Sequence, residues 1–161
     1  MTLDKEKSSP QATVLVVDDN KDTVNILTRL LLRHDMAVLQ AYNGPECLEA
    51  VRTHTVDVIL LDVMMPGMDG LAVCAQLKQL SPAPPIFLVT AKDDMTTRAA
   101  GIKLGISEFV VKPVNHTDLL ARIQTHLSAR RWGQAATEVL DAPREAILLP
   151  ESPARHSVRE R

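Results

Sequence analysis

The stretch "VLVVDDN", residues 14–20, places four apolar residues directly before two neighbouring carboxylates, Asp18 and Asp19. A continuous run of β-branched and aliphatic residues is typical of a strand that is buried on both faces. Two adjacent like charges repel each other, so the pair indicates either a solvated turn that caps a helix or a site that binds a cation. Which of these holds depends on what the other strands carry at their ends.

Runs of the same kind recur along the chain, and stretches of helical period separate them. The expected strands cover residues 13–17, 37–41, 57–61, 85–90 and 107–111. The expected helices cover residues 22–34, 44–54, 70–80, roughly 94–104, and a segment that starts at Asn115. Five short strands that alternate with five helices predict an α/β fold, a doubly wound five-stranded parallel sheet.

Length and composition predict one domain with flexible ends. The chain has 161 residues, of which 45% are hydrophobic and 24% charged, an ordinary globular balance. We expect a flexible N-terminal segment over residues 1–11, the domain over 12–129, and a flexible C-terminal tail without a folded output domain over 130–161. A partner-binding peptide is the alternative reading of that tail, which three prolines interrupt.

Charge, cysteines and the N-terminus limit the class of protein. The formal net charge of −2 gives no general attraction to nucleic acid or to an anionic membrane. The segment "MTLDKEKSSPQA" has no apolar core of the length that a signal peptide needs, so we expect a cytoplasmic location. Cys47 and Cys74 lack CxxC spacing, which argues against a disulfide scaffold or a zinc site and favours small buried residues.

The residues at the strand ends predict a metal site. Asp18 and Asp19 follow the first strand, Asp62 the third and Lys112 the fifth, while Thr90 closes the fourth. The carboxyl ends of parallel strands meet at one edge, where such folds bind ligands. Carboxylates about 4 Å apart repel by about 4 kcal/mol at a dielectric near 20, and one lysine offsets only part of this. A hard divalent cation such as Mg²⁺, which prefers oxygen ligands, would resolve the rest.

A metal beside a carboxylate, an ammonium and a hydroxyl indicates a phosphoryl site. The cation, Lys112 and Thr90 could each take one phosphoryl oxygen. Asp62 is the best candidate for the nucleophile, because it stands alone at the tip of the central strand. The loop "VMMPGMDG" that follows it contains Pro66, Gly67 and Gly70, which allow a tight turn past a ligand.

The chain closely resembles the receiver domain of two-component response regulators over roughly residues 12–129. The matching stretches are "VLVVDDN", "VILLDVMMPGMDGL", "IFLVTA" and "EFVVKPV", in the order and spacing of that family. Each motif is weak alone, but the four at successive strand ends are highly specific. The resemblance implies the flavodoxin-like receiver fold with strand order 2-1-3-4-5.

The resemblance also implies roles at the metal site. Asp62 would be the phosphoacceptor. Asp19 and Asp62 would ligate Mg²⁺ together with the backbone carbonyl of Met64. Asp18 would act mainly through metal-bound water.

Four further residues have roles that the resemblance implies. Lys112 would contact the phosphoryl group, and the Lys112–Pro113 bond would be cis. Thr90 would move toward the phosphoryl oxygens, and Phe109 would follow it inward as the switch aromatic. The face formed by the fourth helix, the fifth strand and the fifth helix would then change, which makes it the expected partner or dimer surface.

The function expected is therefore a phosphorylation-activated signalling module that catalyses only its own phosphorylation and dephosphorylation. A histidine kinase or a phosphotransfer protein would supply the phosphoryl group, and an unknown effector protein would receive the signal. A phosphorylation-dependent homodimer is compatible with the resemblance. No direct binding to nucleic acid is expected, because no helix-turn-helix pattern follows.

Two alternatives come from other functional classes. The first is a phosphatase or phosphotransferase with an aspartyl nucleophile, but such enzymes usually need a second acid two residues later, where Met64 stands. The second is a binding module that does not use phosphate.

Met64 and Lys92 occupy positions that vary in the family and influence how water reaches the acyl phosphate. Because Met64 cannot orient a water molecule, we expect slow self-dephosphorylation.

Overall fold

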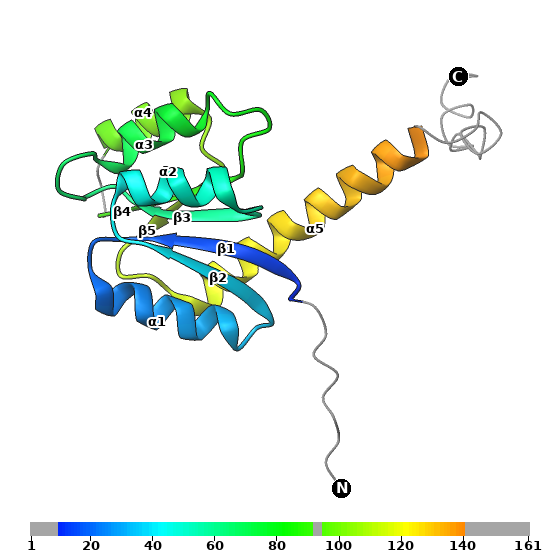
Figure 1. Cartoon of the computed structure of the whole chain (residues 1–161), viewed down its shortest axis with the longest axis horizontal. Helices are drawn as coiled ribbons and strands as arrows, with labels where there is room; N and C mark the ends of the chain where they lie inside the picture. The colour runs from blue at the N-terminus through cyan, green and yellow to red at the C-terminus, as the bar shows by residue number, and fades with distance from the viewer. Residues whose placement is uncertain (1–9, 92–94, 141–161) are drawn as a thin grey trace, which may run out of the picture. The chain divides into compact units, whose positions relative to one another are not determined.

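The computed structural model of the chain describes residues 10–91 and 95–140, the last ten by their backbone alone. Strands and helices alternate along the described chain (Figure 1): β1 (Ala12–Val17), α1 (Lys21–Leu32), β2 (Met36–Ala41), α2 (Gly44–Thr53), β3 (Val58–Asp62), α3 (Gly70–Leu77), β4 (Ile86–Thr90), α4 (Met95–Leu104), β5 (Glu108–Val111) and α5 (His116–Leu140). The strands pair in parallel in the order β2-β1-β3-β4-β5. The predicted α/β fold and strand order are confirmed.

The sheet is the centre of the core because helices cover both of its faces. Every residue of β3 and β4 is buried, as their unbroken apolar sequences predict. Helix α1 lies on one face, and α2, α3 and α4 lie on the other (Figure 1). The buried core consists mainly of aliphatic side chains and contains both cysteines.

Short polar side chains start four of the helices close to the carboxyl edge of the sheet. Asn20, Asn43, Asp69 and Asn115 each accept a hydrogen bond, at 2.8–3.1 Å, from the backbone N–H three residues later. This contact satisfies an N–H group that the first turn of a helix leaves without a partner. The helices expected to begin at residues 44 and 70 do begin there.

Most element boundaries differ from the prediction by one or two residues, and two differ by more. Helix α3 ends at Leu77 rather than at residue 80, because the N–H groups of Gln79 and Leu80 donate to carbonyls only three residues earlier. Helix α5 continues to Leu140, so the tail predicted from residue 130 begins as helix. Residues 130–140 have weak apolar periodicity but contain no proline and several strong helix formers. Propensity therefore extends the helix where periodicity did not predict it.

Contacts divide the chain into residues 1–123 and residues 124–161. The predicted flexible segment 1–11 and the remainder of the predicted tail, residues 141–161, lie almost entirely outside the described residues, as does Lys92. Within the described part of the chain, no helix combines the length and the apolar character that crossing a membrane requires.

Candidate functional site

Three carboxylates meet at the carboxyl edge of the sheet. Asp18 and Asp19 directly follow β1, and Asp62 is the last residue of the neighbouring strand β3. Their carboxylate oxygens lie within 4.8 Å of one another. Asp18 and Asp62 are buried, whereas Asp19 is exposed. The structure therefore brings together the three acids that the sequence predicts to be neighbours.

Asp18 is held in an environment that disfavours its charge. Its Oδ1 atom accepts a hydrogen bond of 2.9 Å from the backbone N–H of Asn20. Burial raises the pKa of the Asp18 carboxyl above its ordinary value, and the negative charge of Asp62 raises it further, while the Asn20 N–H and Lys112 oppose the change. A bound cation would relieve this crowding, so the all-oxygen donor set fits a hard ion such as Mg²⁺. Asn20 was not among the predicted site residues, although its position directly after the acid pair could have indicated it.

Lys112 supplies the positive charge of the site. Its Nζ atom lies 3.1 Å from Oδ1 of Asp62, and its side chain is 40% exposed. The backbone N–H of Lys112 donates to the Thr90 carbonyl at 2.9 Å, which ties the end of β5 to the end of β4. The Lys112–Pro113 peptide bond is cis. One ammonium against three carboxylates leaves an excess of negative charge among these four groups.

The loop from β3 to α3 passes close to Asp62. The backbone N–H of Met64 is 3.4 Å from Oδ1 of Asp62, and the Met64 side chain is 72% exposed. Gly67 has a φ of +79°, which a glycine adopts without strain. A Cβ atom at Gly70 would lie only 2.5 Å from the carbonyl oxygen of Asp62. The glycines of this loop therefore let the chain turn tightly beside Asp62, as the sequence predicts.

The two predicted switch residues lie on neighbouring strands. Thr90 is buried at the end of β4, and its hydroxyl donates to the carbonyl of Ala91 at 3.2 Å. Phe109 is half-buried on β5 and packs against the hydrophobic core. In this structure the Thr90 hydroxyl is therefore engaged by its own loop.

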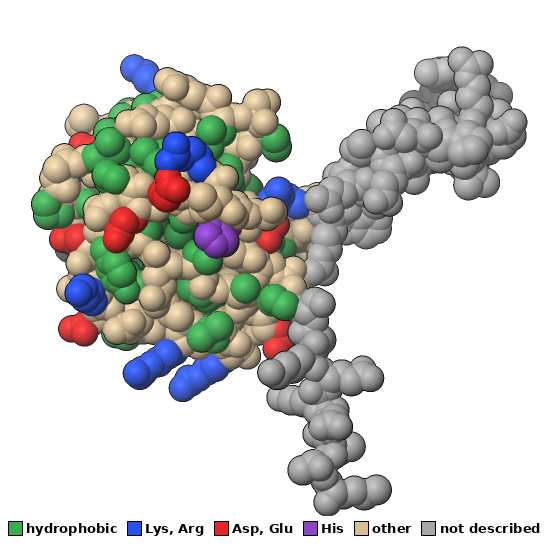
Figure 2. Space-filling view, viewed as in Figure 1, with side chains coloured by type: hydrophobic (Ala, Val, Ile, Leu, Met, Phe, Trp, Pro, Cys, Tyr) green, Lys and Arg blue, Asp and Glu red, His purple; other side chains and the backbone are tan. Residues whose placement is uncertain are grey.

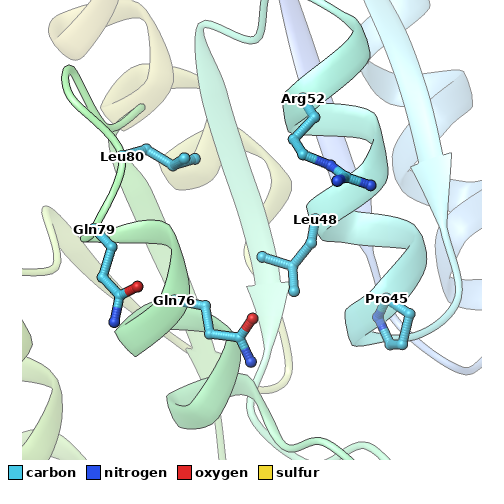
Figure 3. Close-up of a pocket in the computed structure, with 6 residues that line it drawn as sticks. All are labelled: Pro45, Leu48, Arg52, Gln76, Gln79 and Leu80. Carbon is cyan, nitrogen blue, oxygen red and sulfur yellow. The ribbon is translucent and has the colours of Figure 1, made fainter.

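A separate hollow of about 570 Å³ lies between α2 and the end of α3 (Figure 3). Pro45 and Leu48 line it from α2, together with Arg52, and Gln76 and Leu80 line the other side. None of the residues that line it belongs to the acidic cluster. The chemistry of the strand ends therefore lies elsewhere.

The fold and its carboxyl edge define a class of protein, the receiver domains of two-component signalling. Residues 14–124 match the family model of the response regulator receiver domain. The chain therefore belongs to the response regulator receiver domain family. Receiver domains are signalling domains rather than conventional enzymes, and they typically bind Mg²⁺ at an acidic pocket of the kind that Asp18, Asp19 and Asp62 form.

Similar proteins agree with this assignment. "Probable transcriptional regulator ycf27" of Cyanidium caldarium is 37% identical over 127 residues, which cover 79% of this chain and 51% of that protein. The chain thus spans about half the length of this curated relative. The receiver domain of the Francisella response regulator 1452 is 26% identical with a TM-score of 0.69, over 74% of this chain and 98% of that one. A structure described as adenylate cyclase from Rhodopirellula baltica is 28% identical with a TM-score of 0.72, over 82% and 98% respectively.

Proposed function

We propose that this chain is a phosphorylation-activated receiver that accepts a phosphoryl group on Asp62. The observation that carries the proposal is the placement of Asp62. Its buried carboxylate lies 3.1 Å from the Lys112 ammonium and within 4.8 Å of the carboxylate oxygens of Asp18 and Asp19. An oxygen nucleophile between a cation-binding cluster and an ammonium is what a transferred phosphoryl group requires.

The proposed transfer uses a phosphohistidine of a partner kinase or phosphotransfer protein as donor. A carboxylate oxygen of Asp62 attacks the phosphorus, so a P–O bond forms while the P–N bond to the histidine breaks. The imidazole nitrogen leaves with the bonding electron pair. In a separate dephosphorylation step, water attacks the same phosphorus and the P–O bond to Asp62 breaks. The water oxygen and its protons leave with the inorganic phosphate or pass to solvent, and the free carboxylate results. The domain catalyses only these two steps on itself.

Each residue of the edge has a part in this proposal. Bound Mg²⁺ supplies positive charge to the phosphoryl oxygens. Asp19, Asp62 and the backbone carbonyl of Met64 would hold the ion, and Asp18 would act through water molecules bound to it. Lys112 would pair with a phosphoryl oxygen, since its Nζ atom already lies beside Asp62.

The proposed output is a change of the surface formed by α4, β5 and α5. Phosphorylation adds a group of about −1.5 to −2 charges with strong acceptor oxygens. These acceptors favour a conformation in which Thr90 turns from the Ala91 carbonyl toward Asp62 and Phe109 follows it. The changed surface would then bind an effector protein or a second copy of the chain.

Partners and context follow from the same proposal. A receiver domain implies a histidine kinase or another phosphodonor and a downstream effector. We propose that residues 12–129 form the receiver, that the protein is cytoplasmic, and that it makes no direct contact with nucleic acid. Basic and acidic side chains are interspersed on the face of the molecule that Figure 2 shows, which agrees with the small net charge.

Intact-mass measurement tests the proposal directly. The purified chain is incubated with acetyl phosphate and Mg²⁺, and one phosphoryl group is expected on Asp62. Asp62→Ala should remove the added mass, whereas Asp69→Ala should retain it, because Asp69 is an exposed helix cap outside the cluster. No added mass on the wild type, or equal labelling of Asp62→Ala, would refute the proposal. Sustained turnover of small phosphoesters would instead indicate the phosphatase alternative.

A further inference from the structure

A buried glycine lies in the interior of α4, where glycine is unfavourable. Glycine loses more backbone freedom than other residues when a helix forms. The packing around Gly101 should therefore explain why glycine stands at this position of α4. A Cβ atom at this position would lie 2.9 Å from Cζ and 3.0 Å from Cε1 of Phe109, and 3.0 Å from Cδ1 of Ile106. The Phe109 ring therefore occupies the space that a side chain at position 101 would take.

The backbone and the ring of Phe109 are held by different groups. Arg122 Nη1 donates to the carbonyl oxygen of Phe109 at 2.7 Å, which fixes the strand. The guanidinium carbon of Arg98 lies 5.6 Å from the ring centroid, a cation–π contact. Arg98 and Gly101 are three residues apart on α4 and so lie on the same side of the helix. Together with Ile106 they form what we call the Phe109 seat.

Space beside the seat is available for a second position of the Phe109 ring. A hollow of about 370 Å³ adjoins it, lined by Arg98, Phe109 and Arg122 among others. An aromatic side chain can change its χ1 rotamer without moving its backbone. The ring can therefore leave the seat while the Arg122 contact to the Phe109 carbonyl stays in place.

The seat lies on the same side of the sheet as the proposed switch threonine. Phe109 is in register with Leu88 on β4, and Thr90 is two residues further along that strand. Side chains two residues apart on a strand point to the same face. Thr90, Leu88 and Phe109 therefore line one face, and the position of the ring decides how much room remains beside β4.

We propose that Gly101 is a positioning residue for the switch aromatic, because its missing side chain creates the seat from which Phe109 responds to phosphorylation. A side chain at position 101 expels the ring into the adjoining hollow. The surface of α4, β5 and α5 is then uncoupled from Asp62, although the chemistry at Asp62 proceeds. The coupling of this surface to Asp62 rests on the proposed phosphorylation of Asp62, whereas the existence of the Phe109 seat does not.

The seat can be tested without phosphorylation. The wild type, Gly101→Ala, Phe109→Leu and the double variant are compared by thermal unfolding. Gly101→Ala should lower Tm in the wild-type background, because the Cβ and the ring compete for space. It should raise Tm in the Phe109→Leu background, because leucine lacks the competing ring atoms and alanine is the better helix former. A Tm change of the same sign in both backgrounds would overturn the inference.

The ring is observed directly because the chain has only two phenylalanines, Phe87 and Phe109. Ring-¹³C phenylalanine gives two sets of aromatic signals, and Phe109→Leu assigns them. Gly101→Ala should shift the Phe109 set and leave that of the fully buried Phe87 in place. An unmoved Phe109 set in Gly101→Ala would also overturn the inference.

The coupling between Asp62 and the Phe109 ring is measured on the same samples after incubation with acetyl phosphate and Mg²⁺. Intact-mass measurement checks the phosphorylation of each sample. Wild type and Gly101→Ala should both gain one phosphoryl group. The Phe109 signals should move on phosphorylation in the wild type and lose that response in Gly101→Ala. An equal response in both would refute the coupling. An unlabelled wild type would refute the proposed function instead, while the measurements without phosphate still decide whether the seat exists.

Discussion

Replacing Asp18 by asparagine should stabilise the Mg²⁺-free protein. Asparagine keeps an Oδ1 atom that can accept the Asn20 N–H but carries no charge. The carboxylate oxygens of Asp18 and Asp62 lie within 4.8 Å, a separation at which two charges repel by about 3.5 kcal/mol at a dielectric near 20. Lys112 already offsets part of this repulsion. We therefore expect a net gain of about 1–2 kcal/mol, equivalent to a Tm about 3–6 °C higher.

Thermal unfolding in EDTA and in increasing Mg²⁺ measures the effect. The wild type should gain stability with Mg²⁺, and Asp18→Asn should gain less, so the difference between them narrows. Asp69→Asn is the matched control, since it makes the same chemical change at an exposed helix cap where asparagine serves as well as aspartate. If Asp18→Asn leaves Tm unchanged or lower in EDTA while the control is neutral, the three carboxylates do not strain the fold.

Three further predictions test other parts of the structure. Gly70→Ala should cost about 2–3 kcal/mol, because its Cβ would meet backbone atoms, whereas Gly67→Ala, which has open space but a φ of +79°, should cost about 1 kcal/mol; equal losses in urea unfolding would contradict this. Met64→Asn should shorten the phosphorylated half-life followed by mass, since asparagine can orient water, and an unchanged or longer half-life would count against it. Burial raises the pKa of Cys47 to about 12 and that of Cys74 to about 11, so a thiol-reactive disulfide should label neither at pH about 8 until urea unfolds the chain. Because these folded-state pKa values exceed the ordinary 9.0, the stability that the neutral thiols contribute is complete below pH about 9. It is lost as the pH rises from about 9 to about 11 for Cys74 and to about 12 for Cys47. Rapid labelling of the folded protein would disprove the burial.

The sequence predicts the acidic edge well because the prediction depends on topology rather than on detail. Once the runs ending near Asp18, Asp62 and Thr90 are assigned to parallel strands, their carboxyl ends must meet at one edge. Lys112 joins them because it directly follows the last strand of the same sheet. No knowledge of side-chain rotamers is needed for this step, and element boundaries that err by a residue or two do not change it.

Features that depend on contacts between particular side chains could not be predicted in this way. The need for glycine at position 101 becomes clear only when α4 is packed against β5, because the Phe109 ring occupies the space that a side chain there would take. The hydrogen bond from the Thr90 hydroxyl to Ala91 depends on one rotamer at a strand end. The extension of α5 to Leu140 results from propensity in a stretch with little apolar periodicity.

The energy available to the proposed switch limits how it can work. Turning Thr90 toward a phosphoryl group exchanges its neutral bond to the Ala91 carbonyl, about 1 kcal/mol, for a bond to a charged acceptor, about 1.5–3 kcal/mol. The difference is at most about 2 kcal/mol, a shift in population of up to about thirtyfold. Moving a two-state equilibrium from 1:99 to 99:1 takes about 5.5 kcal/mol. The Thr90 bond alone is therefore too weak, and the remainder has to come from Lys112 at the site, from the ring of Phe109, or from a partner that binds only the phosphorylated surface.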